Sequence, residues 1–500
     1  MPETTTRPRA GVRGRARLRR PSVPAPLAAL LGAVLLLGVA WALLVPPFQA
    51  PDEQSHAGYV QSLVEGPGVP GDPGRAAFST EQLRAQDAAN SDQTAGNLSV
   101  NPEWAPLAWE RWRQLDASLP GRFRADGGGN ANPAWSNPPL FYLYDAIPYA
   151  ATSGADYFAR LTAMRVAAVL WLLVTTLGAW LLAGEVVGRD RLLQLVAAGV
   201  AGLLPMVSHI SAQVGPDTLL YALWSLALWL GVRILKRGID VSSAAALLGL
   251  VGLAILTKAT SYALVPAALF ALGVGVWRIR GERPRAMRAA AAGIAALAAP
   301  VVTWFLVARA LDHSAAAQIS TSSKGGGTDV RELASYLWQF YLPRLPFQTS
   351  FDPVHRGLPA FHIWVEQGGA AFGWLEVRFP RGVYRLLALL VALIAVAAVA
   401  RLIATRAQVD RAVAAFLLLA SATLIAALHW TDYHNITGGS GAFMQGRYLF
   451  PLVTIAGLAV AQALRWFDGA ARRVGAGVAL GGLFAFQLCS LALVATRFYA

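Results

Sequence analysis

Two adjacent carboxylates and a histidine follow the first long apolar stretch of the chain. Asp52, Glu53 and His56 belong to the run Pro-Pro-Phe-Gln-Ala-Pro-Asp-Glu-Gln-Ser-His at 46–56. If Pro51 opens a helix, side chains three and four residues apart share a face, so both carboxylates lie near the histidine. An ionised Asp52 in the first turn is stabilised by the helix N-terminus, which suits a general base that must stay deprotonated. Plain helix capping by two loop carboxylates is the alternative interpretation.

Further charged or polar residues stand at the ends of later apolar stretches. Asp217, in Gly-Pro-Asp-Thr, is either a helix cap or part of a site at the membrane surface. Lys258, between two apolar runs, either binds a phosphate as a point charge or snorkels from a tight turn. Gln445 and Arg447 belong to Gln-Gly-Arg-Tyr-Leu-Phe-Pro, and a guanidinium there suits a phosphate through paired hydrogen bonds. Together with the acid pair, these residues predict a site for an anionic, lipid-borne substrate.

A metal site is only weakly indicated. His429, Asp432 and His434 have the composition of a ligand set, but no second marker accompanies them. His56 suits three roles: a partner of the acids, a metal ligand or an ordinary interfacial histidine. The single cysteine, Cys489, excludes a disulfide or a cysteine metal site within one chain. We therefore predict no metal ligands and no certain cofactor, while a divalent metal remains compatible with the carboxylates.

The scaffold that positions these residues must lie in a membrane. The chain has 500 residues, of which 55% are hydrophobic and 14% charged, whereas soluble domains are about 25% charged. Apolar stretches of roughly 20 residues, long enough to cross a bilayer, recur along it. The net charge of +14 is concentrated in the N-terminal tail and in short loops on one side, which is the positive-inside pattern and not a nucleic-acid surface. We predict a multi-pass plasma-membrane protein with no nucleic-acid partner.

We predict an all-α polytopic fold with about eleven transmembrane helices. Residues 1–25 form a basic cytoplasmic tail, and residues 26–500 form one transmembrane domain. The first helix is an uncleaved anchor, because Pro-Pro-Phe follows where a small-residue cleavage site would stand. With the N-terminus in the cytoplasm, long extracytoplasmic loops fall at about 46–163, 311–382 and 430–446, and the candidate site residues come out on the same face of the membrane. The helices are expected to begin near Pro26, Met164, Leu192, Thr218, Val241, Ser261, Ala289, Val383, Ala412, Tyr448 and Val474.

The motifs taken together resemble one bacterial family, the domain of unknown function 2142 (DUF2142) family of predicted membrane proteins. The resemblance rests on the motif at 46–56, on Asn-Pro-Pro-Leu-Phe-Tyr at 137–142, on Phe-Gly-Trp-Leu at 372–375 followed by Pro380, and on Gln-Gly-Arg-Tyr-Leu-Phe-Pro at 445–451. It covers nearly the whole chain after the N-terminal tail. That family is in turn similar to the GT-C superfamily of membrane glycosyltransferases, which keep a catalytic acid in the first outer loop.

The resemblance implies an inverting transfer of a sugar from a polyprenyl-phosphate donor to a cell-envelope acceptor outside the cytoplasm. It implies Asp52 as the catalytic base, with Glu53 as an alternative or partner, and Arg447 and Lys258 as phosphate ligands. Two other classes stay open: a transporter or flippase of lipid-linked sugars, and a non-catalytic envelope scaffold. A transporter should show matched broken helices in two halves, and neither these nor an internal repeat is evident. The sugar, the acceptor and the oligomeric state do not follow from the sequence.

Overall fold

The computed structural model describes residues 23–66, 68–69, 77–100, 106–188, 190–311, 313–314, 329–351, 358–406 and 410–499. Within them the fold is almost entirely helical, as predicted. One antiparallel pair of two-residue strands, β1 (Ala371–Phe372) and β2 (Val377–Arg378), is the exception.

Nine of the described helical segments are long and apolar enough to cross a membrane, or ten if one bent pair counts as a single span. The bent pair is α8 (Arg191–Leu203) and α9 (Pro205–Ser211), which meet at 55°. The nine spans are α1 (Ala25–Leu44), α7 (Tyr157–Val186), α10 (Asp217–Arg237), η3 with α12 (Ala259–Leu264 and Val265–Arg278), α13 (Arg283–Ala310), α17 (Arg381–Ala404), α18 (Arg411–Thr437), η5 with α19 (Gly446–Leu452 and Val453–Leu464) and α20 (Gly469–Tyr499).

The prediction of about eleven spans compares with these nine or ten, and each of the eleven expected positions is helical. Two of them explain the difference. Pro205 begins α9, and a proline cannot continue the hydrogen-bond ladder of the preceding helix, so the segment is bent and counts as a span only when α8 and α9 are taken together. The apolar helix α11 (Val241–Ile255) has only 15 residues, fewer than the roughly 20 that a straight crossing needs.

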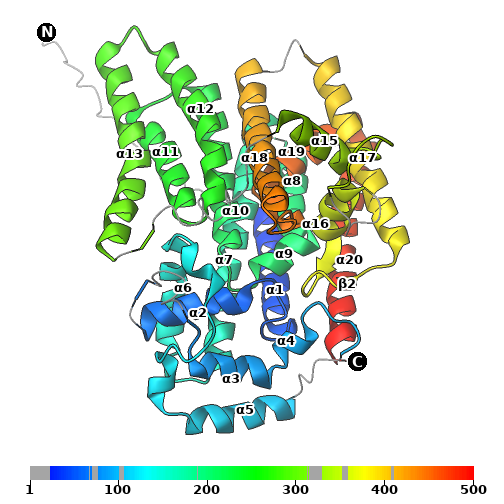
Figure 1. The fold of residues 1–500 in the computed structure, drawn as a ribbon. Coiled ribbons are helices and arrows are strands. Elements are labelled where there is room, and N and C mark those ends of the chain that lie inside the picture. The colour runs from blue at the N-terminus through cyan, green and yellow to red at the C-terminus, as the bar shows by residue number, and fades with distance from the viewer. Residues whose placement is uncertain are drawn as a thin grey trace, which may run out of the picture.

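The long first loop forms a layer of short helices at one end of the bundle (Figure 1). Its elements are α2 (Glu53–Val64), α3 (Thr80–Ala88), α4 (Ser91–Thr94), α5 (Pro106–Ser118), η1 (Gly121–Arg124), η2 (Pro133–Ser136) and α6 (Leu140–Ala151). The later loop between α13 and α17 contributes α15 (Val330–Tyr341), the π-helix η4 (Phe361–Gln367), α16 (Gly368–Ala370) and the strand pair.

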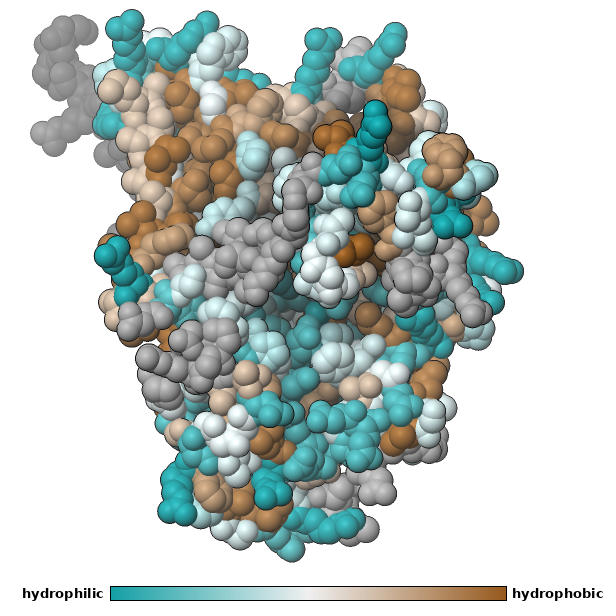
Figure 2. All heavy atoms as spheres, in the orientation of Figure 1, coloured by the Kyte–Doolittle hydropathy of each residue, from teal (hydrophilic) through white to brown (hydrophobic). Residues whose placement is uncertain are grey.

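The spans differ in how far they are enclosed. In α10, 83% of the residues in its apolar 18-residue stretch are buried, against 11% in α13 and 6% in α17. α10 is therefore the central span, and the other two present apolar faces outward. Figure 2 shows apolar side chains gathered over α11–α13, and more hydrophilic ones over the end where α2–α6 lie. This distribution is that of a protein with a lipid-facing band and a polar cap.

Candidate active site

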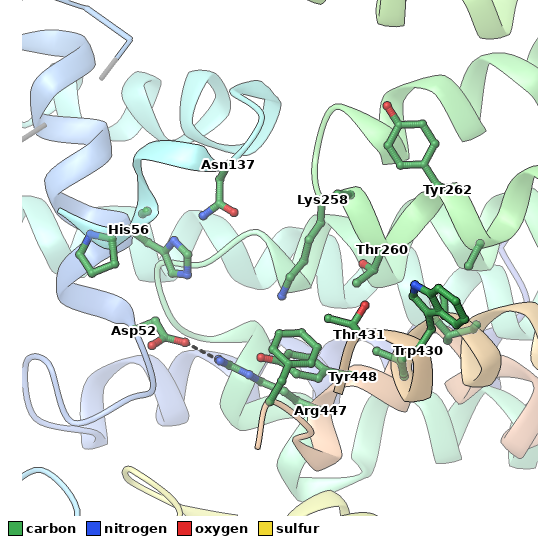
Figure 3. Close-up of a pocket in the computed structure, with 18 of the residues that line it drawn as sticks. Asp52, His56, Asn137, Lys258, Thr260, Tyr262, Trp430, Thr431, Arg447 and Tyr448 are labelled. Atoms are coloured by element: carbon green, nitrogen blue, oxygen red, sulfur yellow. Dashed lines mark hydrogen bonds and ion pairs between the residues drawn. The ribbon is translucent and has the colours of Figure 1, made fainter. Parts of the chain in front are cut away.

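A cavity of about 490 Å³ lies where the first-loop layer meets the ends of the spans. Four of the predicted site residues line it: Asp52, His56, Lys258 and Arg447. They come from the α1–α2 connection, α2, the α11–η3 connection and η5, so segments far apart in the chain converge here. In Figure 3 the carboxylate of Asp52 and the cationic groups of Lys258 and Arg447 point into the same space. Pro133, Ala134 and Asn137 of the first loop complete this side of the cavity.

Asp52 stands at the head of α2 in an unusual backbone conformation. Its φ of 65° lies in the left-handed region, which is uncommon for residues other than glycine. The helix begins at Glu53, so the expectation that Asp52 sits inside the first turn was wrong; it is the N-cap residue, and its side chain caps nothing. The carboxylate instead points away from the helix, with 47% of the side chain exposed. The backbone turn is what delivers this acid to the cavity.

Arg447 and Lys258 are held by two carboxylates. Nη2 of Arg447 lies 2.5 Å from Oδ2 of Asp52, and Nη1 lies 3.8 Å from Oδ2 of Asp217. Nζ of Lys258 lies 2.7 Å from Oδ1 of Asp217. Asp217 is buried and does not line the cavity, so it anchors the two cations from behind. The charges of the two carboxylates and the two cations balance. An incoming anion can therefore bind Arg447 by replacing Asp52.

The environment of Asp52 sets its protonation state. Burial alone would raise the pKa of Asp52, but the nearby guanidinium of Arg447, with a smaller effect of Lys258, outweighs it and holds the pKa below the usual 3.8. Asp52 is therefore a carboxylate throughout the neutral range. Such a group can accept a proton or orient one, but it cannot serve as an acid.

His56 faces the cavity as part of a short hydrogen-bond chain. Its Nδ1 lies 2.8 Å from the hydroxyl of Tyr142, which in turn accepts a 2.8 Å hydrogen bond from the Asn137 amide. Tyr59 stacks on Tyr142 with ring centroids 3.8 Å apart. Burial lowers the pKa of His56 to about 4, although Asp52 opposes this. The imidazole is therefore neutral at pH 7, and its Nδ1 shares a hydrogen bond with the tyrosine hydroxyl.

Two residues of this hydrogen-bond chain, Asn137 and Tyr142, were not among the predicted site residues. Asn137 lines the cavity and Tyr142 lies directly behind His56. Both belong to the Asn-Pro-Pro-Leu-Phe-Tyr motif at 137–142, which carries part of the family resemblance. Neutral residues give no charge signal, so only the motif itself could have pointed to them.

Glu53 lies elsewhere. Its side chain is 0% exposed, and its two oxygens lie 2.7 and 2.5 Å from Nε and Nη2 of Arg165 in α7. The backbone amides of Phe48 and Val214 also donate to it. The Arg165 guanidinium further donates to the carbonyls of Ala42, Val45 and Pro46. With both oxygens engaged and no place in the cavity lining, Glu53 fixes the end of α1 and the start of α2, which argues against its predicted role as a base.

Gln445 also lies outside the cavity lining, and its motif has a packing role. Gly446 packs so closely on another loop that a Cβ there would stand 2.3 Å from the backbone nitrogen of Gly368. The Gly446 amide donates to Gln367, and the Arg447 carbonyl accepts from Tyr221. Gln445 precedes this contact as the N-cap of η5. The glycine thus lets η5 seat Arg447 against the bundle.

The histidines and aspartate at the end of α18 do not form a metal set. Among the described residues no group of three or more His, Cys, Asp or Glu side chains could hold a metal ion. Asp432 accepts hydrogen bonds from the amides of Phe443 and Met444 and from the hydroxyl of Tyr336. His429 contacts Tyr336 and Tyr341 through its two ring nitrogens. These residues tie α15 and the segment before Arg447 to α18.

The far side of the cavity is apolar and aromatic. It is lined by Leu424, Ala427, Leu428 and Trp430 of α18 and by Tyr262 and Ala263. Tyr448 forms a boundary with the charged side, with its ring centroid 5.0 Å from Nζ of Lys258. Thr260, also in the lining, has a buried hydroxyl that finds no hydrogen-bond partner among the described residues. The cavity therefore offers charge at one end, a hydroxyl in the middle and an apolar wall at the other.

Similarity to known proteins extends over most of the chain. The sequence model of the DUF2142 family, described as predicted membrane protein, matches residues 35–456. No curated protein matches the chain. ArnT from Cupriavidus metallidurans bound to undecaprenyl phosphate is 16% identical, with a TM-score of 0.43 over 95% of this chain and 64% of that one. The oligosaccharyltransferase AglB from Archaeoglobus fulgidus, in complex with an inhibitory peptide and a dolichol-phosphate, is 10% identical, with a TM-score of 0.45 over 95% of this chain and 56% of that one. The chain thus spans less than two thirds of the length of either protein, and likenesses this remote do not bear on activity.

Proposed function

The chain belongs to the DUF2142 family of predicted membrane proteins, and from that premise we propose that it is a membrane glycosyltransferase acting on a polyprenyl-phosphate sugar. One observation carries the proposal: a half-exposed carboxylate, Asp52, shares a cavity with Arg447 and Lys258, and the opposite wall of that cavity is apolar. The chemical groups of such a donor match this cavity. Its phosphate suits the two cations, and its prenyl chain suits the apolar wall. The proposed acceptor is a hydroxyl of the cell envelope, and the proposed location of the cavity is the extracytoplasmic face of the plasma membrane.

The donor phosphate is held by the two cations. Arg447 presents a guanidinium whose paired donors match phosphate oxygens, and Lys258 adds a point charge. When the phosphate takes Nη2 of Arg447, it displaces the carboxylate of Asp52 that occupies this position in the structure. Asp217 keeps its contacts of 2.7 and 3.8 Å to the two cations, so they stay in place while their ligand changes.

Displaced from Arg447, Asp52 acts as the base. It takes the proton of the acceptor hydroxyl as that oxygen attacks the anomeric carbon. The bond between the anomeric carbon and the phosphate oxygen breaks, and the electron pair leaves with the polyprenyl phosphate. Arg447 and Lys258 stabilise the charge that develops on this leaving group. The reaction yields the glycosylated acceptor and polyprenyl phosphate, with the proton on Asp52.

The described residues offer these cations, and no metal set, for the phosphate charge. Asp52, which lines the cavity, and Asp217, which is buried behind it, already pair with Arg447 and Lys258. We therefore expect transfer to persist after treatment with a chelator.

The test is transfer of radiolabelled sugar by purified protein in lipid vesicles. Undecaprenyl-phosphate and dolichol-phosphate sugars are the donors to try first, since these lipid phosphates are bound in the two structures named above. Transfer by the wild type that is lost in Asp52→Asn, at equal amounts of folded protein, is the expected result. Vesicles that move the labelled lipid between leaflets without transferring its sugar would identify a flippase instead. Transfer that ignores Asp52 would remove the proposed base.

A further inference from the structure

A second cavity, of about 440 Å³, lies at the opposite end of the bundle from the candidate active site. α10 connects the two regions: Asp217, at the start of this helix, stands behind the first cavity, and Lys236, near its end, lines the second. The helix has 21 residues, so the two ends are about 30 Å apart at 1.5 Å per residue. That is the thickness of the hydrocarbon core of a bilayer. The second cavity therefore opens at the other membrane face.

Its walls are built from three spans. α17, α18 and α19 supply an apolar lining that includes Ala398, Leu417 and Leu458. Leu402 and Leu418, which also line it, are 42% and 69% exposed, so the cavity opens sideways onto the surface of the bundle. Only 6% of the apolar stretch of α17 is buried. Its outer surface therefore meets the hydrocarbon of the bilayer. Figure 1 places the end of α17 and the start of α18 at the end of the bundle farthest from α2–α6.

Two cations stand at the mouth. Lys236 and Arg465 both line the cavity, and no carboxylate of the described residues lies within ion-pair distance of either. Lys236 donates to the Glu185 carbonyl oxygen, and Arg465 donates to Gln462 at 3.3 Å. The Glu185 carboxylate is taken by Arg233 and Arg237.

One acid also reaches this mouth. Asp410 lines the cavity, and its Oδ1 accepts from the amides of Ala412 and Val413 at the start of α18. A carboxylate in that position is neutralised in part by the helix N-terminus. The net charge at the mouth is therefore positive.

From an apolar cavity open to the bilayer and a cationic mouth at its surface, we propose a binding site for an anionic phospholipid of that leaflet. The phosphate lies between Lys236 and Arg465, and an acyl chain fills the space between α17, α18 and α19. A neutral zwitterionic lipid carries its own cation and gains less from this mouth. The site is separate from the proposed transfer reaction and stands or falls independently of it.

The test is native mass spectrometry of the full protein released from membranes that contain equal amounts of phosphatidylglycerol and phosphatidylcholine. Three proteins are compared with the wild type. Lys236→Gln with Arg465→Gln removes the charges, and Ala459→Trp fills the lining from α19. Arg283→Gln, at the exposed start of α13 on the same face, is the control for surface charge.

We expect the wild type and the control to retain phosphatidylglycerol over phosphatidylcholine, and the two cavity variants to retain at least threefold less of it. Equal retention of both lipids by the wild type would overturn the proposal. So would a loss in the control that equals the loss in the double variant, because the lipid would then follow overall charge. Retention that survives Ala459→Trp would place the lipid on the surface and not in the cavity, whether or not the charge variants bind. Thermal unfolding of each variant shows that it is folded.

Discussion

Nη2 of Arg447 lies 2.5 Å from Oδ2 of Asp52, although 395 residues separate them in the chain. This ion pair joins the two motifs that stand near opposite ends of the sequence. It also gives the proposed base a partner that must be exchanged before the base can act. The structure thus represents a state in which the acid and the phosphate ligand satisfy each other.

Asp52→Asn should abolish most transfer while leaving the fold intact. The amide keeps the size of the side chain but cannot accept the acceptor proton, and general bases contribute roughly 10²- to 10⁴-fold to rate. Because Asp52 is about half exposed, its charge adds little to stability. The measurement is kcat in vesicles beside thermal unfolding. A variant that loses its fold together with its activity would show a structural acid instead.

The pH dependence of transfer should change in Arg447→Gln. In the wild type the pKa of Asp52 is held below 3.8 despite its burial, mainly by Arg447, so loss of base function begins only below about pH 4. Without the guanidinium, burial raises the pKa of Asp52 and the acidic limb moves to higher pH. The profile of kcat/KM between pH 3 and 8 reports it. Identical limbs in both proteins would mean that another group is the base.

Glu53→Gln should destabilise the protein and not act on catalysis directly. Glu53 and Arg165 are 0% and 3% exposed, and removing one partner of a buried ion pair costs about 3–5 kcal/mol. Glu53→Gln combined with Arg165→Met should recover part of this loss, since no unpaired charge then remains. Thermal unfolding measures both, with Glu110→Gln, from an exposed pair with Arg113, as the matched control. Equal shifts for Glu53→Gln and the control would contradict the assignment.

Gly446→Ala should impair transfer through a packing change. The added Cβ would stand 2.3 Å from the Gly368 nitrogen, a backbone atom that cannot move aside as a flexible side chain would. Since Arg447 is the next residue, the proposed phosphate ligand is displaced, and KM for the donor should rise. The control is Gly477→Ala in α20, where nothing lies within 4 Å of the new Cβ. Comparable KM values for the two variants would show that η5 tolerates the shift.

The protein should lose stability as the pH falls from about 6.5 to about 4, in part because of His56. The pKa of this histidine is about 4 in the folded chain and 6.5 when unfolded, so within this window only the unfolded state gains a proton. The loss of stability caused by His56 is absent above pH 6.5 and complete below pH 4. His56→Gln should flatten this part of the curve of unfolding temperature against pH. An unchanged slope would mean that other groups account for the whole effect.

Charge and membrane side were enough to predict which segments meet. Asp52, His56, Lys258 and Arg447 were placed on one face because they stand at the ends of apolar stretches, and they line one cavity. The choice between Asp52 and Glu53 could not be made in this way. It depends on the left-handed backbone at Asp52 and on Arg165, which lies 112 residues from Glu53. Neither is visible in the spacing of the motif.

The span count shows a different limit. Hydropathy located the apolar helices but did not predict where one is short or bent. The count depends on the length of α11, which has only 15 residues, and on the bend between α8 and α9 at Pro205. Tyr142 and Asn137 show a third limit, because the hydrogen bonds of neutral side chains depend on tertiary contacts.

The contact between Glu53 and Arg165 has a consequence for biogenesis. α1 and α7 are the first two candidate spans in the described chain, and this ion pair, with the carbonyls at the end of α1, joins them. An arginine within a span is costly in lipid unless it is paired. Its partner has already been synthesised when α7 leaves the ribosome. The ion pair can therefore join the two spans as soon as both are made. The backbone that positions Asp52 can form before most of the bundle has been translated.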